Sequence, residues 1–181
     1  MPFSRAHLTS ADWAKELLTT DKDLDDFFVS CHVAGPNACA FYKSTTSKIK
    51  QRYNNLFTSL RKQPVVIHSN STFGIVDEAT LRAAVLSVLY QPYPGYSLLA
   101  PALAALEQGD SFQIFQLFGG PTLDQCSANS TNNSSDTSVA IACGDAIVES
   151  TSAADLIQYY QRNIRISSFL DDWLQHKAVC T

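Results

Sequence analysis

This 181-residue chain is poor in charged residues and contains no long apolar run. Only 17% of its residues are charged, the 13 Lys and Arg are scattered, and the net charge is -4, so nucleic-acid binding is not expected. No apolar stretch reaches the roughly 20 residues that a membrane-spanning helix needs, so no membrane span is predicted. The amino terminus, MPFSRAHLTSADW, also lacks the apolar core of a signal peptide.

Familiar catalytic motifs are missing as well. A serine hydrolase raises its nucleophile on a strand-to-helix turn, normally Gly-x-Ser-x-Gly, and this pattern is absent. Gly95-Tyr96-Ser97 supplies only half of it and precedes an apolar helix start, so Ser97 is a weak nucleophile candidate. The four histidines stand in no signature with a carboxylate or a cysteine, and no phosphate-cradling glycine loop occurs. The sequence predicts no cofactor and no metal site.

What the chain does contain is helical periodicity, and 45% of its residues are hydrophobic. This pattern predicts a mainly α fold in one domain spanning residues 1–181. Two short extended pieces around Asn70 predict a β-hairpin, and residues 126–138 read as a polar loop. We expect helices from Ser10, over 20–31, 45–60, 77–90, 96–107 and 110–118, and over 152–163 and 168–177, with Asp77 and Asp110 among the caps.

Two cysteines flank a Gly-Pro turn at the end of the second predicted helix. Cys31 lies on the apolar stripe of that helix, which Thr20 or Asp21 would cap at its start. Gly35 can supply a left-handed helix end, and the proline after it prevents continuation, so the chain reverses there. Cys39 is therefore brought back toward Cys31, and a disulfide between them is predicted, as in an oxidising compartment.

A metal site that uses Cys31, His32 and Cys39 is the functional alternative at this turn. Zinc sites usually carry a Cys-x-x-Cys pair, which this spacing lacks. Neighbouring residues on a helix also face different directions, so Cys31 and His32 are poorly placed to share one ion. The disulfide is the favoured interpretation.

Four asparagines lie in N-glycosylation acceptor motifs, which occur in secreted proteins: Asn70, Asn129, Asn132 and Asn133. The last three fall within the predicted polar loop, where a glycan is easily carried. The glycosylation motifs and the predicted disulfide are both typical of a secreted protein. An amino terminus without the apolar core of a signal peptide is not. A chain with these features is expected to be a piece of something longer.

In the segment Ala140–Ala146, an apolar run is followed by a cysteine, a glycine and an acidic residue. One interpretation is a packed segment in which Asp145 caps the next helix. In the other, Asp145 or Glu149 is an anionic lining group that meets the ammonium of a substrate. Both interpretations remain open from the residues alone.

Three segments together resemble one enzyme family: TDKDLDDFFVSCHVAGPNACAFY (20–42), LRAAVLSVLYQPYPGYSLLAPALAALEQGD (81–110) and AIACGD (140–145). They are similar, in the same order, to the tripeptidyl-aminopeptidase-like α/β-hydrolases of fungi and actinobacteria, which are serine peptidases related to proline iminopeptidase. In that family these segments lie in the helical cap inserted into the hydrolase core. The resemblance covers most of the chain.

The resemblance implies that the nucleophile and the catalytic Asp and His lie outside this cap, so no triad residue is assigned here. It implies a second disulfide, Cys143 with Cys180, which leaves Cys126 as an odd cysteine. It also implies secretion of the full-length enzyme. The chain begins close to where the cap would begin and ends where the core would resume, so a truncated product, a gene-model fragment or a degenerate paralogue is expected.

By this resemblance the chain is the cap of a secreted-type serine hydrolase, which gates the active site and selects peptide-like substrates without catalysis of its own. Its partner would be the hydrolase core, or a second copy that meets the apolar face a missing core leaves exposed. The alternative function is a stand-alone helical protein that binds a peptide or a lipid.

Overall fold

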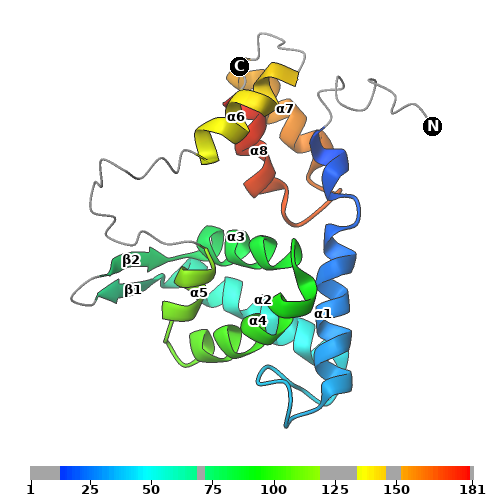
Figure 1. Ribbon diagram of the computed structural model, residues 1–181, viewed down its shortest axis with the longest axis vertical. Helices are drawn as coiled ribbons and strands as arrows, with labels where there is room; N and C mark the ends of the chain where they lie inside the picture. The colour runs from blue at the N-terminus through cyan, green and yellow to red at the C-terminus, as the bar shows by residue number, and fades with distance from the viewer. Residues whose placement is uncertain (1–12, 69–71, 119–133, 146–151, 180–181) are drawn as a thin grey trace. The chain divides into compact units, whose positions relative to one another are not determined.

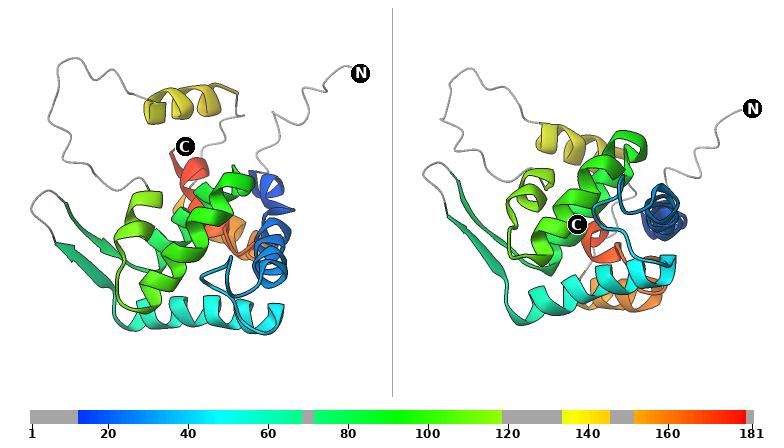
Figure 2. Two further views of the ribbon diagram at one scale, coloured as in Figure 1. Left: turned by 60° about the horizontal axis from the view of Figure 1, so that its bottom comes forward. Right: turned by 90° about the horizontal axis from the view of Figure 1, so that it is seen from below.

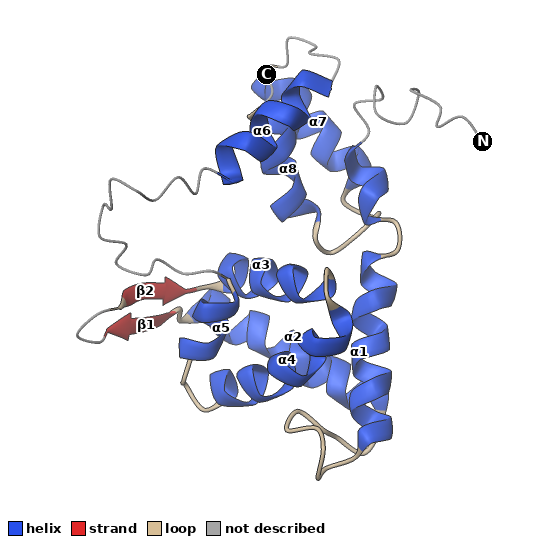
Figure 3. Ribbon diagram, in the orientation of Figure 1, coloured by secondary structure: helices blue, strands red, loops and turns tan. Residues whose placement is uncertain are grey.

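The computed structural model describes residues 13–68, 72–118, 134–145 and 152–179, and these form a mainly α fold (Figure 1). Eight α-helices, one short 3₁₀ helix and a two-stranded antiparallel sheet make up the described part. Strands occur there only in this hairpin, as the secondary-structure colours show (Figure 3). The prediction of a mainly α fold with a short hairpin is confirmed.

The chain divides into two compact units, one of residues 22–125 and one that combines residues 1–21 with 126–181. Each unit is described by itself. The grouping of residues 1–181 into a single domain stays a prediction.

Residues 22–125 contain most of the described elements. These are α1 (Thr20–Ala34), which begins just before the unit, α2 (Thr46–Lys62), β1 (Val65–His68), β2 (Phe73–Val76), α3 (Glu78–Leu89), α4 (Pro92–Glu107) and α5 (Phe112–Leu117). The helices gather around one core, and the hairpin extends outward from them in every view (Figures 1 and 2). The apolar stripe predicted for α2 faces this core, because Ile49, Tyr53, Leu56 and Leu60 are all buried.

A chain of aromatic rings runs through this core. Phe27 and Phe28 are fully buried on α1, with ring centroids 5.6 Å apart in an edge-on arrangement. Tyr96 of α4 lies 5.3 Å from Phe27, and Tyr53 of α2 lies 5.4 Å from Phe28. Phe57 extends the chain, 5.0 Å from Tyr53. These rings tie α1, α2 and α4 together through contacts that add to the burial of their area.

The hairpin packs by one face only. Val65 pairs with Val76 and Ile67 with Gly74, and Ile67 and Val76 are buried. Gly74 has no room for a side chain, since a Cβ there would lie 2.4 Å from the ring of Phe115 on α5. The alternation of the strands places Val66, Phe73 and Ile75 on the other face, where all three are exposed.

Helix α3 begins at a well-formed cap. Asp77 has extended backbone angles, and its Oδ1 accepts hydrogen bonds from the backbone N–H of Thr80 at 2.8 Å and from its hydroxyl at 2.9 Å. The predicted cap is confirmed. These bonds favour the ionised carboxylate, and the backbone bond from Thr80 is the main reason that the pKa of Asp77 lies below its ordinary value of 3.8.

We expect the Asp77 cap to make stability depend on pH in acid. A carboxyl whose pKa is lowered in the folded state stabilises it above the unfolded pKa of about 4, and this contribution is lost as the pH falls through the folded pKa. The variant Asp77→Asn should keep the cap but lose this part of the pH dependence, and Asp77→Ala should cost about 1 kcal/mol at neutral pH. Urea unfolding between pH 7 and pH 2.5 measures both. An unchanged acid slope in Asp77→Asn would contradict the assignment.

Helices α3 and α4 approach closely at Gly95. A Cβ at this position would lie 2.6 Å from a methyl carbon of Val88 and 2.9 Å from the backbone oxygen of the same residue. Gly95 is buried within α4, where glycine otherwise weakens a helix. The close contact of the two backbones explains its presence.

The second unit contains a short 3₁₀ helix, η2 (Trp13–Leu17), and the helices α6 (Ser134–Asp145), α7 (Ala153–Asn163) and α8 (Leu170–Ala178). The backbone N–H of Ala14 donates to the hydroxyl of buried Tyr159 at 2.8 Å. Ser168 donates from its hydroxyl to Asp21 at 2.6 Å. These bonds join segments more than 140 residues apart in sequence.

Several element boundaries differ from the sequence predictions. Helix α4 begins at Pro92 rather than Tyr96, because proline lacks the N–H that the first turn leaves without a partner in any case. Thr20 and Asp21 lie inside α1 rather than before it. Residues 134–138 of the predicted polar loop form the start of α6, and residues 126–133 lie outside the described part.

Asp145 does not cap the helix that follows it. It is the last residue of α6, while α7 is capped by Ser152, whose side chain and that of Asp155 form a reciprocal capping box. The Ser-x-x-Asp pattern at this position satisfies two backbone N–H groups at once. Asp155 is held ionised by this arrangement, since the side-chain hydrogen bond from Ser152 lowers its pKa.

Candidate binding groove

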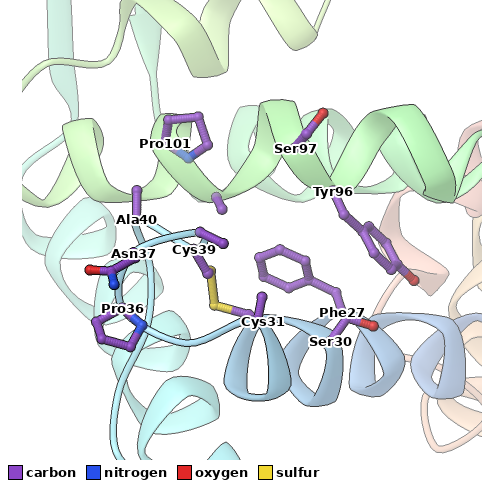
Figure 4. Close-up of a pocket in the computed structure, with 13 residues that line it drawn as sticks. Phe27, Ser30, Cys31, Pro36, Asn37, Cys39, Ala40, Tyr96, Ser97 and Pro101 are labelled. Atoms are coloured by element: carbon purple, nitrogen blue, oxygen red, sulfur yellow. A yellow bond between two sulfur atoms is a disulfide. The ribbon is translucent and has the colours of Figure 1, made fainter.

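An open groove of about 530 Å³ lies in the unit of residues 22–125, within the range of volumes that hold small ligands. Its walls come from the second half of α1, from the loop that follows it and from α4 (Figure 4). The lining residues are Phe27, Ser30, Cys31, Ala34, Pro36, Asn37, Ala38, Cys39, Ala40, Tyr96, Ser97, Ala100 and Pro101.

The wall between α1 and the loop is held by the predicted disulfide, which is confirmed. Gly35 ends α1 with a φ of 78°, and its carbonyl accepts the backbone N–H of Cys39 at 3.0 Å. The chain thus reverses within four residues, and the Cα atoms of Cys31 and Cys39 come within 5.3 Å. Both sulfurs are in the bond, so neither is a thiolate that could ligate a metal.

Phe41 directly follows the loop residues that line the groove, and it holds that end of the loop in the core. Phe41 is fully buried, and the guanidinium of Arg52 lies over its ring at 4.2 Å. The Nε of Arg52 also donates to both carboxylate oxygens of Glu107 at 3.0 Å. This hydrogen-bonded pair lowers the pKa of Glu107 and links α2 to the end of α4. The disulfide and this anchor hold the loop at both of its ends.

Tyr96 and Phe27 form the aromatic end of the groove. The Tyr96 hydroxyl donates to the backbone oxygen of Asp23 at 2.7 Å, which fixes the ring beside α1. Burial is the first cause of the raised pKa of Tyr96, followed by the carboxylates of Asp26 and Asp23. This end is therefore partly shielded from water, with two acids just outside the lining.

The opposite wall is interrupted by a proline. Pro101 lies inside α4, and because it has no N–H it cannot donate to the carbonyl of Ser97, four residues earlier. Both residues line the groove. The Ser97 hydroxyl donates to the Pro94 carbonyl at 2.7 Å, so it is engaged with its own helix. Ser97 therefore does not stand on a nucleophile elbow.

None of the described residues that line the groove is an Asp, Glu, Lys, Arg or His. The groove offers apolar contact from rings and methyl groups, with a few uncharged polar atoms at its walls. The described residues that line it include no pair of charged or imidazole side chains.

Protein-family models, curated proteins and solved structures were compared with this chain, and none matches.

Asn70, Asn129, Asn132, Asn133 and Glu149 lie outside the described residues, as do Cys126 and Cys180. Cys143, on α6, is disulfide-bonded. Its pairing with Cys180 stays a prediction, and so does a substrate-lining role for Asp145 or Glu149.

Among the described residues, no cluster of three or more His, Cys, Asp or Glu side chains could hold a metal ion. None of the helices described is both long and apolar enough to cross a bilayer.

Sequence reasoning missed the groove itself. It predicted the Gly-Pro turn that brings Cys39 to Cys31, but it did not predict that this loop and α4 line one groove. One signal was present in Pro101, a proline within an otherwise regular apolar helix, because such a residue frees a backbone carbonyl one turn earlier.

Proposed function

We propose that this chain is the substrate-selecting cap of a serine α/β-hydrolase that resembles the tripeptidyl aminopeptidases, and that it has no catalytic activity of its own. The observation that carries the proposal is the groove. It is an open groove with a covalently pinned wall, and no charged or imidazole side chain is among the described residues that line it.

The helical fold supports this role. Cap domains cover the mouth of an active site, exclude water and admit only substrates of suitable shape, and helices joined by short loops supply such a surface. A hydrolase core would then hold the Ser-His-Asp triad. By the resemblance of residues 20–42 and 81–110 to the cap of that family, α1, the disulfide loop and α4 would belong to the cap, and so would the groove that they line.

The exposed outer face of the hairpin supports a partner. Val66 is 70% exposed and Phe73 61%, and with Ile75 they form an apolar patch on this face, beside exposed His68, which pairs with Phe73. Surfaces of this kind commonly mark an interface. In the cap reading this face contacts the hydrolase core.

A fluorophosphonate probe tests the catalytic part of the proposal. The purified chain should show no covalent labelling and no turnover of aminoacyl or tripeptidyl chromogenic substrates, because the described residues present no activated serine. The control is a Ser97→Ala variant, treated in the same way. Labelling of the chain that disappears in Ser97→Ala would show that the chain is itself a serine hydrolase and would overturn the proposal.

The DNA on both sides of the reading frame tests the cap assignment. A Gly-x-Ser-x-Gly segment upstream and a strand-rich segment with a histidine downstream support a cap, because the triad would be encoded around it. Clean intergenic sequence on both sides would favour the other function, a stand-alone helical protein that binds a peptide or a lipid.

A further inference from the structure

We propose that the Cys31–Cys39 bond is a redox-controlled latch on the groove. Oxidation fixes the loop of residues 36–40 as a wall, whereas the reduced chain stays folded with that loop released. The groove is then complete in an oxidising compartment and incomplete in a reducing one. This inference concerns the state in which the groove exists, so it goes beyond the proposed function and does not depend on it.

The loop has few ties other than this bond. Its exposed side chains are those of Pro36, Asn37, Ala38 and Ala40. The backbone N–H groups of Ala38 and Cys39 both donate to the carbonyl of Gly35, inside the turn itself. Within the part of the chain that the structure describes, residues 36–38 make no other hydrogen bond, ion pair or ring contact. The position of the loop therefore depends on the sulfur bond and on how its two ends are held.

A non-covalent clasp, formed by His32, Tyr42 and Lys43, closes the base of the loop. The ring of His32 stacks on that of Tyr42, with centroids 5.9 Å apart and planes 7° apart. The Nδ1 of His32 lies 3.3 Å from the backbone oxygen of Lys43 and donates to it in the tautomer that carries the proton there. Neither contact uses a sulfur atom, so both persist when the bond is broken.

Breaking the bond is therefore expected to release the loop without unfolding the unit of residues 22–125. The aromatic chain of the core joins α1, α2 and α4 and contains no residue of the loop. The clasp keeps the two reduced cysteines close together, because His32 directly follows Cys31 and Tyr42 lies three residues after Cys39. A high effective concentration of one thiol at the other favours closure of the bond in an oxidising environment.

Each change of state is a two-electron thiol–disulfide exchange with a dithiol. In reduction, one thiolate of the dithiol attacks a sulfur of the protein bond, which forms a mixed disulfide and releases the other protein sulfur. The second thiolate then displaces the remaining protein sulfur, so the protein gains two thiols and the dithiol becomes a cyclic disulfide. Oxidation by a disulfide reagent is the reverse exchange. Both cysteines line the groove, which gives the attacking thiolate its approach (Figure 4).

Backbone ¹⁵N relaxation of the intact chain tests the latch, with the chain oxidised and then treated with dithiothreitol. The amide order parameters of Asn37, Ala38 and Ala40 should be about 0.85 in the oxidised chain and fall below about 0.6 in the reduced chain. That of buried Leu103 on α4 should stay unchanged. A loop that is equally ordered in both states would overturn the proposal, and so would unfolding of the whole unit on reduction.

The double variant Cys31→Ala/Cys39→Ala is the matched control. Its loop should be as mobile as that of the reduced wild type, and dithiothreitol should not change it further. Because the variant keeps Cys143, whose disulfide the reagent also reaches, this comparison assigns the change to the Cys31–Cys39 bond. A loop in the double variant that becomes mobile only after dithiothreitol is added would contradict the latch.

The variant His32→Ala tests the clasp. Without the imidazole ring the reduced thiols are held together less closely, so the equilibrium constant for closing the bond against glutathione should fall about three- to tenfold. Mass mapping of the Cys31–Cys39 bond measures this constant. Lys43→Ala is the control, because it removes an exposed side chain and keeps the carbonyl that accepts from His32.

Equal equilibrium constants for His32→Ala and Lys43→Ala would show that the clasp does not hold the thiols together, and the latch would lose its second closure. None of these measurements involves hydrolase activity, so the latch and the cap assignment can fail separately.

Discussion

Replacing Phe28 by alanine should destabilise the unit of residues 22–125 by about 3 to 5 kcal/mol. Phe28 is fully buried and stands in the middle of the aromatic chain, in ring contact with Phe27 on one side and Tyr53 on the other. The substitution removes a large apolar side chain and leaves a cavity between α1 and α2. It also breaks two ring contacts, an edge-on one with Phe27 and a tilted one with Tyr53.

Urea unfolding followed by circular dichroism at 222 nm measures this loss. The control is Val33→Ala on the same helix, because Val33 is 79% exposed and should change the unfolding free energy by less than about 0.5 kcal/mol. If Phe28→Ala cost no more than the control, the aromatic chain would not be the centre of the core.

The second large effect is expected from the disulfide. The double variant Cys31→Ala/Cys39→Ala should lose about 2 to 3 kcal/mol, because the bond closes a loop with a sequence separation of eight and limits the unfolded chain. Alanine is used at both positions since both side chains are buried, and serine would bury a hydroxyl.

Reductant provides the internal comparison: it should lower the stability of the wild type by at least as much as the double substitution does. Any further effect of reductant on the double variant reports the disulfide of Cys143. A double variant as stable as the oxidised wild type would contradict this prediction.

Local signals in the sequence predicted much of the described fold. Asp77 begins α3 and the Gly-Pro turn brings Cys39 to Cys31, because capping and chain reversal depend on a few neighbouring residues. The hairpin was also predicted from its two short extended pieces. These features need no knowledge of distant contacts.

Contacts between segments that are distant in sequence could not be predicted from these local signals. The meeting of the 36–40 loop with α4 depends on how Phe41, Arg52 and Glu107 pack, and no local pattern encodes that arrangement. The capping interpretation of Asp145 was wrong for another reason, because Ser152, seven residues later, caps α7 with a Ser-x-x-Asp pattern. The groove is thus a product of tertiary packing.

Gly95 sets opposing demands on one position. Nearly every other residue has a higher intrinsic helix propensity than glycine. At this position, however, Val88 lies too close to leave room for a Cβ atom. Laboratory selection for thermostability should therefore replace glycine readily at open helical positions such as Gly144, where a methyl group meets nothing within 4 Å, and leave Gly95 unaltered.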